Sequence, residues 1–355
     1  MQARAPALQK TMPDFSTRLI AWQKIHGRHD LPWQNTHDPY AIWVSEIMLQ
    51  QTQVTAVIPY YQRFMQRFPD ISSLAAAEQE QVLLHWSGLG YYSRARNLHN
   101  AAQVIMDEHG GRFPQDFESI LSLPGIGRST AAAVASFAFG QRQAILDGNV
   151  KRVFARHFLV EGWPGLPKVE KQLWLLAEDL LPATDMVAYT QGLMDLGATL
   201  CSRAKPKCGA CPLKQTCGAY QQQRVTELPV SRPRKVTPQK HTTMLILRRG
   251  NEVMLEKRPP SGIWGGLWSL PEIEPDMRPE DAARQRYGVH AEALPVLPSL
   301  SHTFTHFKLD IRPQPMTVLR IAPQAREAGL VWLGLEDAIG AALPTPVRKI
   351  LQSLK

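Results

Sequence analysis

The sequence predicts a multidomain protein in which an all-helical region precedes a small α+β domain. Three observations support this fold class: helical apolar spacing through the first part of the chain, a proline-rich stretch after residue 224, and strand-like alternation beyond it. At 355 residues the chain is long enough for two or three domains. We therefore expect a helical region over 1–225, a linker over 226–241 and an α+β domain over 242–355.

The helical prediction depends on apolar residues that recur at steps of three, four or seven between residues 14 and 140. One run shows the spacing well: Trp43, Ile47, Val54, Ile58, Tyr61, Phe64 and Phe68. The linker prediction depends on residues 224–240, RVTELPVSRPRKVTPQK, which contain three prolines, scattered charges and no periodic apolar pattern.

Strand signals fill the C-terminal part. Residues 242–247 and 252–256 predict a hairpin around Gly250-Asn251. Residues 301–312 alternate over their whole length and predict one continuous strand. Helical stretches at 279–287 and 346–354 complete an α+β domain.

The composition is that of an ordinary globular protein, with 44% hydrophobic and 20% charged residues. No stretch approaches the roughly 18 apolar residues of a membrane span, and the N-terminus MQARAPALQK lacks the apolar centre of a secretory signal. We expect a monomer in the bacterial cytoplasm or nucleoid, without a membrane partner. The net charge of +9 favours a polyanionic partner such as nucleic acid, although a solvated surface explains it as well.

All four cysteines lie in one loop with the spacing C-x6-C-x2-C-x5-C: Cys201, Cys208, Cys211 and Cys217. In a reducing compartment such a cluster indicates metal ligands rather than disulfides. Structural zinc prefers two short-spaced pairs, and this loop has only one, so the spacing favours a [4Fe–4S] cluster and leaves zinc as the alternative. The same loop carries Lys205 and Lys207, which could contact phosphates or simply be solvated.

A second motif, LPGIGRST at residues 123–130, precedes an apolar helical run that stops at Gly140. Gly125 and Gly127 would leave backbone N–H groups uncovered at the positive end of a helix, where a DNA phosphate can bind. An ordinary interhelical turn is the alternative.

LPGIG before a helix, LDGNVKRV at residues 146–153 and the cysteine loop together resemble the helix-hairpin-helix DNA glycosylases of the endonuclease III superfamily. The resemblance implies a helix-hairpin-helix module over 31–140 and a second module, formed by the N-terminal segment with 141–225, that holds a [4Fe–4S] cluster on the four cysteines.

Within that superfamily, WVSEIMLQQTQV at residues 43–54 resembles the adenine DNA glycosylases of the MutY type. The resemblance implies a base excision repair enzyme that hydrolyses the N-glycosidic bond of adenine opposite 8-oxoguanine or guanine in double-stranded DNA. Two alternatives remain: an endonuclease III-type glycosylase/lyase for oxidised pyrimidines, and a non-catalytic iron–sulfur module that binds DNA. A sliding clamp or mismatch-repair proteins would be further partners, which no motif here reveals.

In this family a glutamate of the same helix is the general acid, and the resemblance places that role on Glu46. Adenine departs through an oxocarbenium-like transition state, so the base must gain a proton while positive charge grows on the sugar. Glu46 lies beside the apolar face of its helix, and burial would raise its pKa so that it protonates adenine N7. Asp147 would stay ionised and stabilise the cation, with or without transient attack, and Asn149 would help position it. Otherwise Glu46 is a surface residue and Asp147 a turn former.

Ser129 stands where bifunctional relatives carry a Schiff-base lysine, so we expect no strand cleavage. It could also cap the helix. The resemblance further places Tyr91 and Gln51 beside the base opposite adenine, and Trp33 and Leu49 in the wall of the adenine pocket. On general grounds Tyr91 would be a core aromatic.

Residues 255–268, LEKRPPSGIWGGLW, resemble the Nudix-related C-terminal domain of these enzymes. Its expected helix, PEDAARQRY, lacks the consecutive glutamates that hold Mg²⁺ in Nudix hydrolases, which argues against pyrophosphatase activity. The family reads 8-oxoguanine with Phe-Ser-His, and Phe304, Thr305 and His306 occupy that place. Threonine keeps the hydroxyl but changes the contact geometry.

Overall fold

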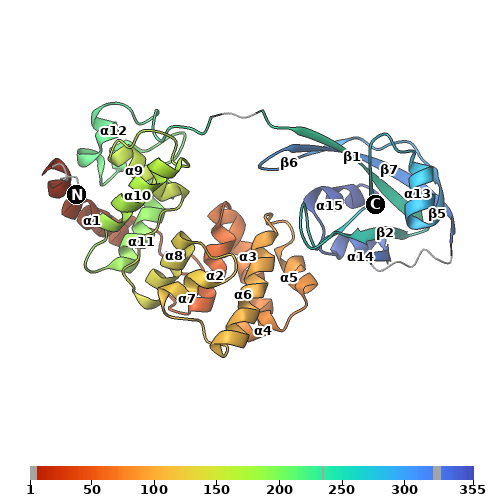
Figure 1. Cartoon of the computed structure of the whole chain (residues 1–355), viewed down its shortest axis with the longest axis horizontal. Helices are drawn as coiled ribbons and strands as arrows, with labels where there is room; N and C mark the ends of the chain where they lie inside the picture. Colours follow the sequence, from red (N-terminus) through yellow and green to blue (C-terminus); the bar gives the residue numbers. More distant parts are fainter. Residues whose placement is uncertain (1–5, 234–235, 323–328) are drawn as a thin grey trace. The chain divides into compact units, whose positions relative to one another are not determined.

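The computed structural model describes residues 6–233, 236–322 and 329–355 (Figure 1). It divides into two compact units. The first comprises residues 1–76 and 100–234, and the second comprises residues 77–99 and 235–355. The N-terminal region is helical and the C-terminal region is α+β, which confirms the predicted fold class. The predicted boundaries did not anticipate that residues 77–99 belong with the C-terminal region.

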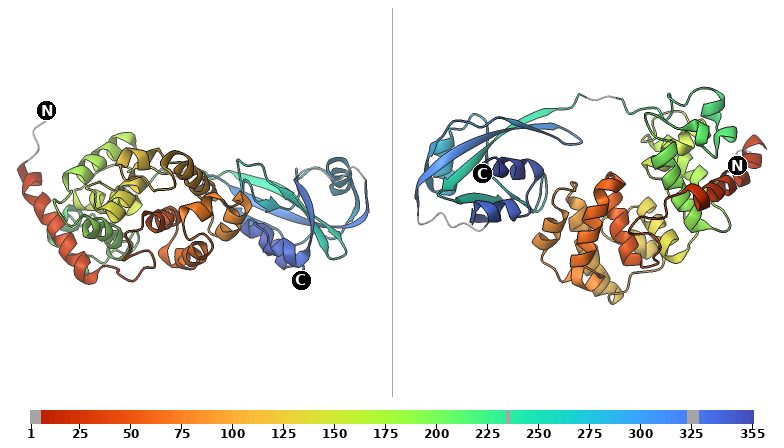
Figure 2. Two further views of the ribbon diagram at one scale, coloured as in Figure 1. Left: turned by 90° about the horizontal axis from the view of Figure 1, so that it is seen from below. Right: turned by 180° about the vertical axis from the view of Figure 1, so that it is seen from behind.

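The first unit is built from helices. They are α1 (Pro6–His26), α2 (Pro39–Leu49), α3 (Val54–Arg67), α4 (Ile71–Ala75), α7 (Phe117–Ser122), α8 (Arg128–Phe139), α9 (Gly148–His157), α10 (Pro167–Asp179), α11 (Met186–Asp195) and α12 (Gly218–Gln221), together with most of α6 (Ser93–His109). Although distant in sequence, α1 packs beside α11 (Figures 1 and 2). No helix in the described part of the chain combines the length and apolar content of a membrane span.

One apolar core joins α1 to α8, α9, α10 and α11. Phe15 and Leu19 of α1 and Phe154 of α9 are fully buried in it. Leu146 and Val150 belong to the same core and flank Asp147 in sequence. Packing of these neighbours in the core therefore fixes the backbone on both sides of Asp147.

Helix α2 is buried on most of its surface. The side chain of Asp38 caps it by accepting hydrogen bonds from the N–H groups of Tyr40 and Ala41, and Pro39 occupies its first turn. Ile42, Trp43 and Met48 are buried. A helix fixed in this way holds Glu46, which is half-buried, in one orientation.

The predicted helical hairpin is formed by α7 and α8. Gly125 in the turn has φ +78°, a conformation that other residues rarely adopt. Gly127 is the N-cap of α8, which receives no side-chain cap. The helix ends at Phe139, and the left-handed Gly140 follows it, as predicted.

The second unit contains a mixed sheet with the strand order β3-β2-β1-β7-β5; β4 also pairs with β1, β6 with β7 and β8 with β2. The strands are β1 (Gln239–Arg249), β2 (Glu252–Lys257), β3 (Trp268–Ser269), β4 (Glu272–Ile273), β5 (Val289–Ala293), β6 (Leu300–Thr303), β7 (Lys308–Ile321) and β8 (Leu330–Gly334). The helices are α5 (Gln79–Trp86), the first part of α6, α13 (Pro279–Tyr287), α14 (Leu335–Gly340) and α15 (Thr345–Gln352), and α13 packs on β5 (Figure 1).

The predicted hairpin is confirmed, because Arg248 pairs with Val253 across antiparallel β1 and β2. Strand β1 begins at Gln239, within the expected linker. The prediction of one strand over 301–312 is wrong: β6 and β7 form an antiparallel hairpin in which Thr303 pairs with Lys308. Paired residues share a face of the sheet, so the pairing of Thr303 with Lys308 shifts the alternation by one position at the turn, and no single alternating pattern runs through both strands.

Candidate active site and DNA-contacting loops

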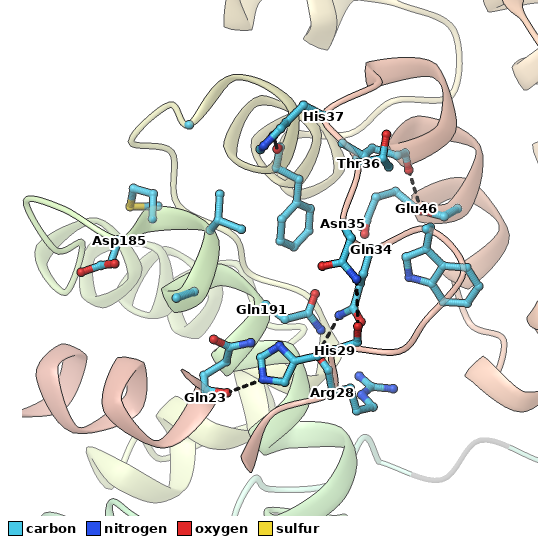
Figure 3. A pocket seen from close by; sticks show the side chains of 18 residues that line it. Gln23, Arg28, His29, Gln34, Asn35, Thr36, His37, Glu46, Asp185 and Gln191 are labelled. Carbon is cyan, nitrogen blue, oxygen red and sulfur yellow. Dashed lines mark hydrogen bonds between the residues drawn. The ribbon is translucent and has the colours of Figure 1, made fainter. Parts of the chain in front are cut away.

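A cavity of about 820 Å³ opens beside α2 in the first unit (Figure 3). Helix α2 contributes Glu46, the loop before it contributes Arg28 and Trp33, and α11 contributes Gln191. Trp33 is buried and meets Tyr61 edge-on, with ring centroids 5.3 Å apart. Most of the lining residues are polar, and Trp33, Ile42 and Phe137 add apolar surface against which a planar base can lie.

Glu46 has an unusual protonation equilibrium. Burial and, secondarily, the nearby Asp147 carboxylate raise its pKa to about 8. At neutral pH this carboxyl therefore keeps its proton while facing the cavity. That is the state that a general acid needs before it protonates a leaving group.

Asp147 is the N-cap of α9. Its Oδ1 accepts a hydrogen bond from the N–H of Val150 at 2.8 Å, and its Oδ2 accepts one from Asn149 Nδ2 at 3.3 Å. Burial raises its pKa, whereas these bonds and the charge of Arg152 favour the ionised form. The two carboxyls thus occupy different surroundings, and donors to Asp147 can hold a negative charge there.

The orientation of Asn149 is fixed by Arg152, whose role the sequence analysis missed. Arg152 Nη2 donates to Asn149 Oδ1 at 2.8 Å and to the carbonyl of Gly197 at 2.7 Å. Its Nε donates to the carbonyl of Cys201 at 2.7 Å. Because the amide oxygen of Asn149 is thus occupied, its NH₂ group faces Asp147.

We predict that Gly197→Ala lowers activity by displacing Asn149. A Cβ at this position would lie 2.5 Å from the Cβ of Asn149 and 3.2 Å from its Cα, so backbone must move. Overpacking of this kind costs about 1–3 kcal/mol. The measurements are the thermal midpoint and the single-turnover rate. Gly209→Ala serves as the control, because nothing lies within 4 Å of its added Cβ. Equal rates for both variants would contradict the prediction.

Ser129 does not cap α8, so that alternative is wrong. The N-cap is Gly127, and Ser129 Oγ instead accepts a hydrogen bond from the N–H of Leu146 at 3.0 Å. Ser129 therefore ties the start of α8 to the segment that carries Asp147.

Two of the predicted DNA-contacting residues have a left-handed backbone conformation. Gln51, just after α2, has φ +57° and is exposed. Tyr91, which belongs to the second unit, has φ +49° and is 46% exposed, so the core-aromatic alternative is wrong. Such strain in non-glycine residues often occurs at functional sites. Leu49 is half-buried at the end of α2 and does not line the cavity beside Trp33.

The other predicted DNA contacts are accessible. Gly125 and Gly127 are exposed ahead of α8, and Lys205 and Lys207 are exposed in the cysteine loop. Backbone N–H groups at a helix start and lysine side chains are both suited to phosphate.

The β6–β7 turn carries Phe304, Thr305 and His306. Phe304 stacks on Phe307 with centroids 4.6 Å apart, while Thr305 and His306 are exposed at the tip. Thr305 Oγ1 lies 3.5 Å from Tyr91 Oη within the second unit. The turn thus exposes two polar side chains beside a pair of stacked phenylalanine rings.

The four cysteines line one small apolar pocket together with Leu213 and Arg156. Arg156 Nη1 lies 3.4 Å from Cys201 Sγ and donates to the carbonyl of Ser202 at 2.8 Å. All four thiols are free and half-buried. No group of three or more His, Cys, Asp or Glu side chains among the described residues is spaced for a single metal ion. Convergent thiols with a cationic neighbour fit an anionic iron–sulfur cluster.

Comparisons with known proteins match both parts of the chain. Residues 44–179 match the HhH-GPD superfamily of base excision DNA repair proteins, and residues 242–353 match the NUDIX domain. The chain is 38% identical to the adenine DNA glycosylase of Buchnera aphidicola (Acyrthosiphon pisum), covering 96% of this chain and 97% of that protein. It is 33% identical to the mouse adenine DNA glycosylase, covering 95% and 77%.

Solved structures agree with the helical fold. A thermostable thymine-DNA glycosylase aligns with a TM-score of 0.56 and 33% identity over 61% of this chain and 99% of that one. Endonuclease III in a non-covalent DNA complex aligns with a TM-score of 0.52 and 20% identity over 61% and 97%, which shows the shared fold. The relatives that align over nearly the whole chain decide among these glycosylases, and the chain belongs to the adenine DNA glycosylase (MutY) family of the HhH-GPD superfamily.

Proposed function

We propose that this chain is a monofunctional DNA glycosylase that removes adenine paired with 8-oxoguanine or guanine from double-stranded DNA. Membership of the adenine DNA glycosylase family supports adenine excision in base excision repair. The observation that carries the chemistry is a cavity-lining carboxyl, Glu46, whose pKa of about 8 is raised partly by a second carboxylate, Asp147.

In the proposed reaction, the flipped adenine enters the cavity against Trp33. Glu46 transfers its proton to adenine N7, the N9–C1′ bond breaks with its electrons passing to the base, and Asp147 stabilises the cationic sugar. Water then adds to C1′ and returns a proton to Glu46. Asn149, held by Arg152, keeps Asp147 oriented.

Two further features support the monofunctional assignment and the cofactor. Ser129 has no amine for a Schiff base, and its oxygen already accepts the Leu146 N–H. Cys201, Cys208, Cys211 and Cys217 would hold the [4Fe–4S] cluster, which when bound supplies a rigid anchor for the loop that carries Lys205 and Lys207. The Thr305 and His306 side chains would contact the base opposite adenine.

The experiment is single-turnover processing of duplexes with adenine opposite 8-oxoguanine, guanine or thymine, and of one duplex with an oxidised pyrimidine, each with and without alkali. We expect strand breaks only after alkali and only in the 8-oxoguanine and guanine duplexes. Breaks without alkali would contradict the role of Ser129. Activity confined to the pyrimidine lesion, or none despite DNA binding, would overturn the proposed substrate in favour of a lyase or a binding module.

A further inference from the structure

Arg94, in the first turn of α6, is a buried cation that the proposed mechanism does not use. The residue is only 8% exposed. A positive charge at this place faces the positive end of the helix dipole and loses its hydration, and both effects are unfavourable. Burial accordingly lowers the pKa of Arg94 to about 10, although the nearby Tyr91 acts in the opposite direction. A residue type that is unfavourable at its own position is expected to have a role outside its helix.

The side chain of Arg94 reaches back to the loop between α5 and α6. Its Nη2 donates a hydrogen bond to the Gly90 carbonyl at 3.2 Å, and Trp86 Nε1 donates to the same oxygen at 3.1 Å. The guanidinium carbon lies 5.4 Å from the ring centroid of Trp86 and 5.4 Å from that of Tyr91. The backbone N–H of Arg94 donates to the Tyr91 carbonyl at 2.9 Å. One residue thus contacts both the ring and the backbone of Tyr91.

The loop needs such support because two consecutive residues have a left-handed backbone. Gly90 has φ +79° and Tyr91 has φ +49°. Glycine adopts this conformation freely, whereas tyrosine does so at a cost that the surroundings must offset. Tyr91 nevertheless keeps this conformation with its side chain 46% exposed. Arg94 contacts both the Gly90 carbonyl and the Tyr91 ring, so it can offset that cost.

We propose that Arg94 is a positioning residue that holds Tyr91 in the conformation in which it enters the DNA beside the base opposite adenine. The inference rests on the proposed function and adds the group that prepares this side chain before DNA binds. Without the support, only a fraction of the free molecules would have the left-handed loop, and the apparent affinity would fall by that fraction. With it, the ring is already placed to stack where two bases separate.

Arginine is suited to this role because its guanidinium is planar. It can lie on an aromatic face and still donate hydrogen bonds in its own plane, here to the Gly90 carbonyl. Lysine would keep the charge but not the planar set of donors. Methionine would fill much of the same space without charge or donors. The two substitutions therefore remove the contacts in steps.

The first measurement is the single-turnover rate as a function of protein concentration, with adenine opposite 8-oxoguanine. We expect Arg94→Met to raise the half-saturating concentration about tenfold and to leave the maximal rate within about twofold. Fewer free molecules then have the loop in place, whereas the chemistry at Glu46 is unchanged. Arg94→Lys should give an intermediate value. Arg249→Met is the control, since it removes an exposed arginine from the face of Trp332 in the same unit.

The second measurement needs no substrate. Chymotrypsin cleaves after aromatic residues, and cleavage within a folded protein follows the population of locally opened backbone. Arg94→Met should increase cleavage after Tyr91 about tenfold, as read from the fragment masses, because the released loop leaves its strained conformation. Arg249→Met should leave this cleavage unchanged.

A lower maximal rate without a rise in the half-saturating concentration would show a merely structural role and overturn the proposal. Cleavage after Tyr91 that is no faster than in the control would also overturn it. If Arg94→Met does not fold, Arg94→Lys decides: a rise of about threefold in both quantities supports the proposal, and no rise refutes it. Absence of adenine excision by the unmodified protein would instead refute the proposed function, and the cleavage measurement would still test how Tyr91 is held.

Discussion

Glu46→Gln should abolish adenine release while DNA binding persists. Glutamine has nearly the same shape and can still donate a hydrogen bond, but it cannot transfer a proton to adenine N7. Loss of a general acid costs about 10²–10⁴-fold in rate. The measurements are the single-turnover rate and the affinity for a duplex with adenine opposite 8-oxoguanine. Glu161→Gln is the control, because Glu161 is an exposed partner of Arg224.

The pH dependence checks the same assignment. Because the pKa of Glu46 is raised from 4.5 to about 8, the rate should fall as pH rises through about 8. Between those values the folded protein holds a proton that the unfolded chain has released, so the free energy of unfolding decreases as pH rises. Glu46→Gln removes this cost, and at pH 9 we expect it to raise the free energy of unfolding by roughly 1–3 kcal/mol, a value reduced for partial exposure. A destabilised variant, or a wild-type rate that stays flat from pH 6 to 9, would refute the assignment.

Asp147→Asn should slow adenine release about 10²–10³-fold with little change in stability. Asparagine caps helices as well as aspartate does, so the bond from the Val150 N–H can persist. The substitution removes the negative charge beside the developing sugar cation. Loss of such electrostatic stabilisation slows a reaction about 10²–10³-fold.

The matched control for Asp147→Asn is Asp116→Asn. Asp116 caps α7 by accepting the Ser119 N–H at 2.9 Å, but it is exposed and, unlike Asp147, has no electrostatic effect on Glu46. Both variants should therefore unfold at similar temperatures, and only the change at Asp147 should affect the rate. If Asp147→Asn retained more than a third of the rate, or if both variants lost activity equally, the electrostatic role would be wrong.

Local motifs account for what could be predicted from the sequence. Glu46, Asp147 and the four cysteines each lie in a short sequence pattern that indicates their chemistry without knowledge of the fold. The helix stop at Gly140 and the hairpin around Gly250-Asn251 likewise depend on neighbouring residues, and both are confirmed.

Residues that act through distant contacts could not be predicted in this way. Arg28 lines the cavity, and its ion pair with Asp195, 167 positions away, forms only because α1 packs beside α11. Arg152 lies within the LDGNVKRV motif, yet its contact with Cys201 becomes visible only once α9 is placed. The turn at residues 304–307 was missed because the alternation on its two sides was taken as one pattern, whereas the pairing of Thr303 with Lys308 reverses which residues share a face.

The second unit is formed by two segments that are far apart in the sequence, and this affects how the chain folds during synthesis. Within that unit Glu80 accepts hydrogen bonds from Trp268 Nε1 at 2.6 Å and Lys257 Nζ at 2.7 Å, and Arg96 donates to the Gly265 carbonyl at 2.7 Å. Residues 77–99 leave the ribosome before residues 100–234 and must wait for the C-terminal strands, on the order of ten seconds at usual elongation rates. Nascent chains of this protein should therefore expose one helical segment until translation ends, and premature termination in the linker would leave it permanently without its partners.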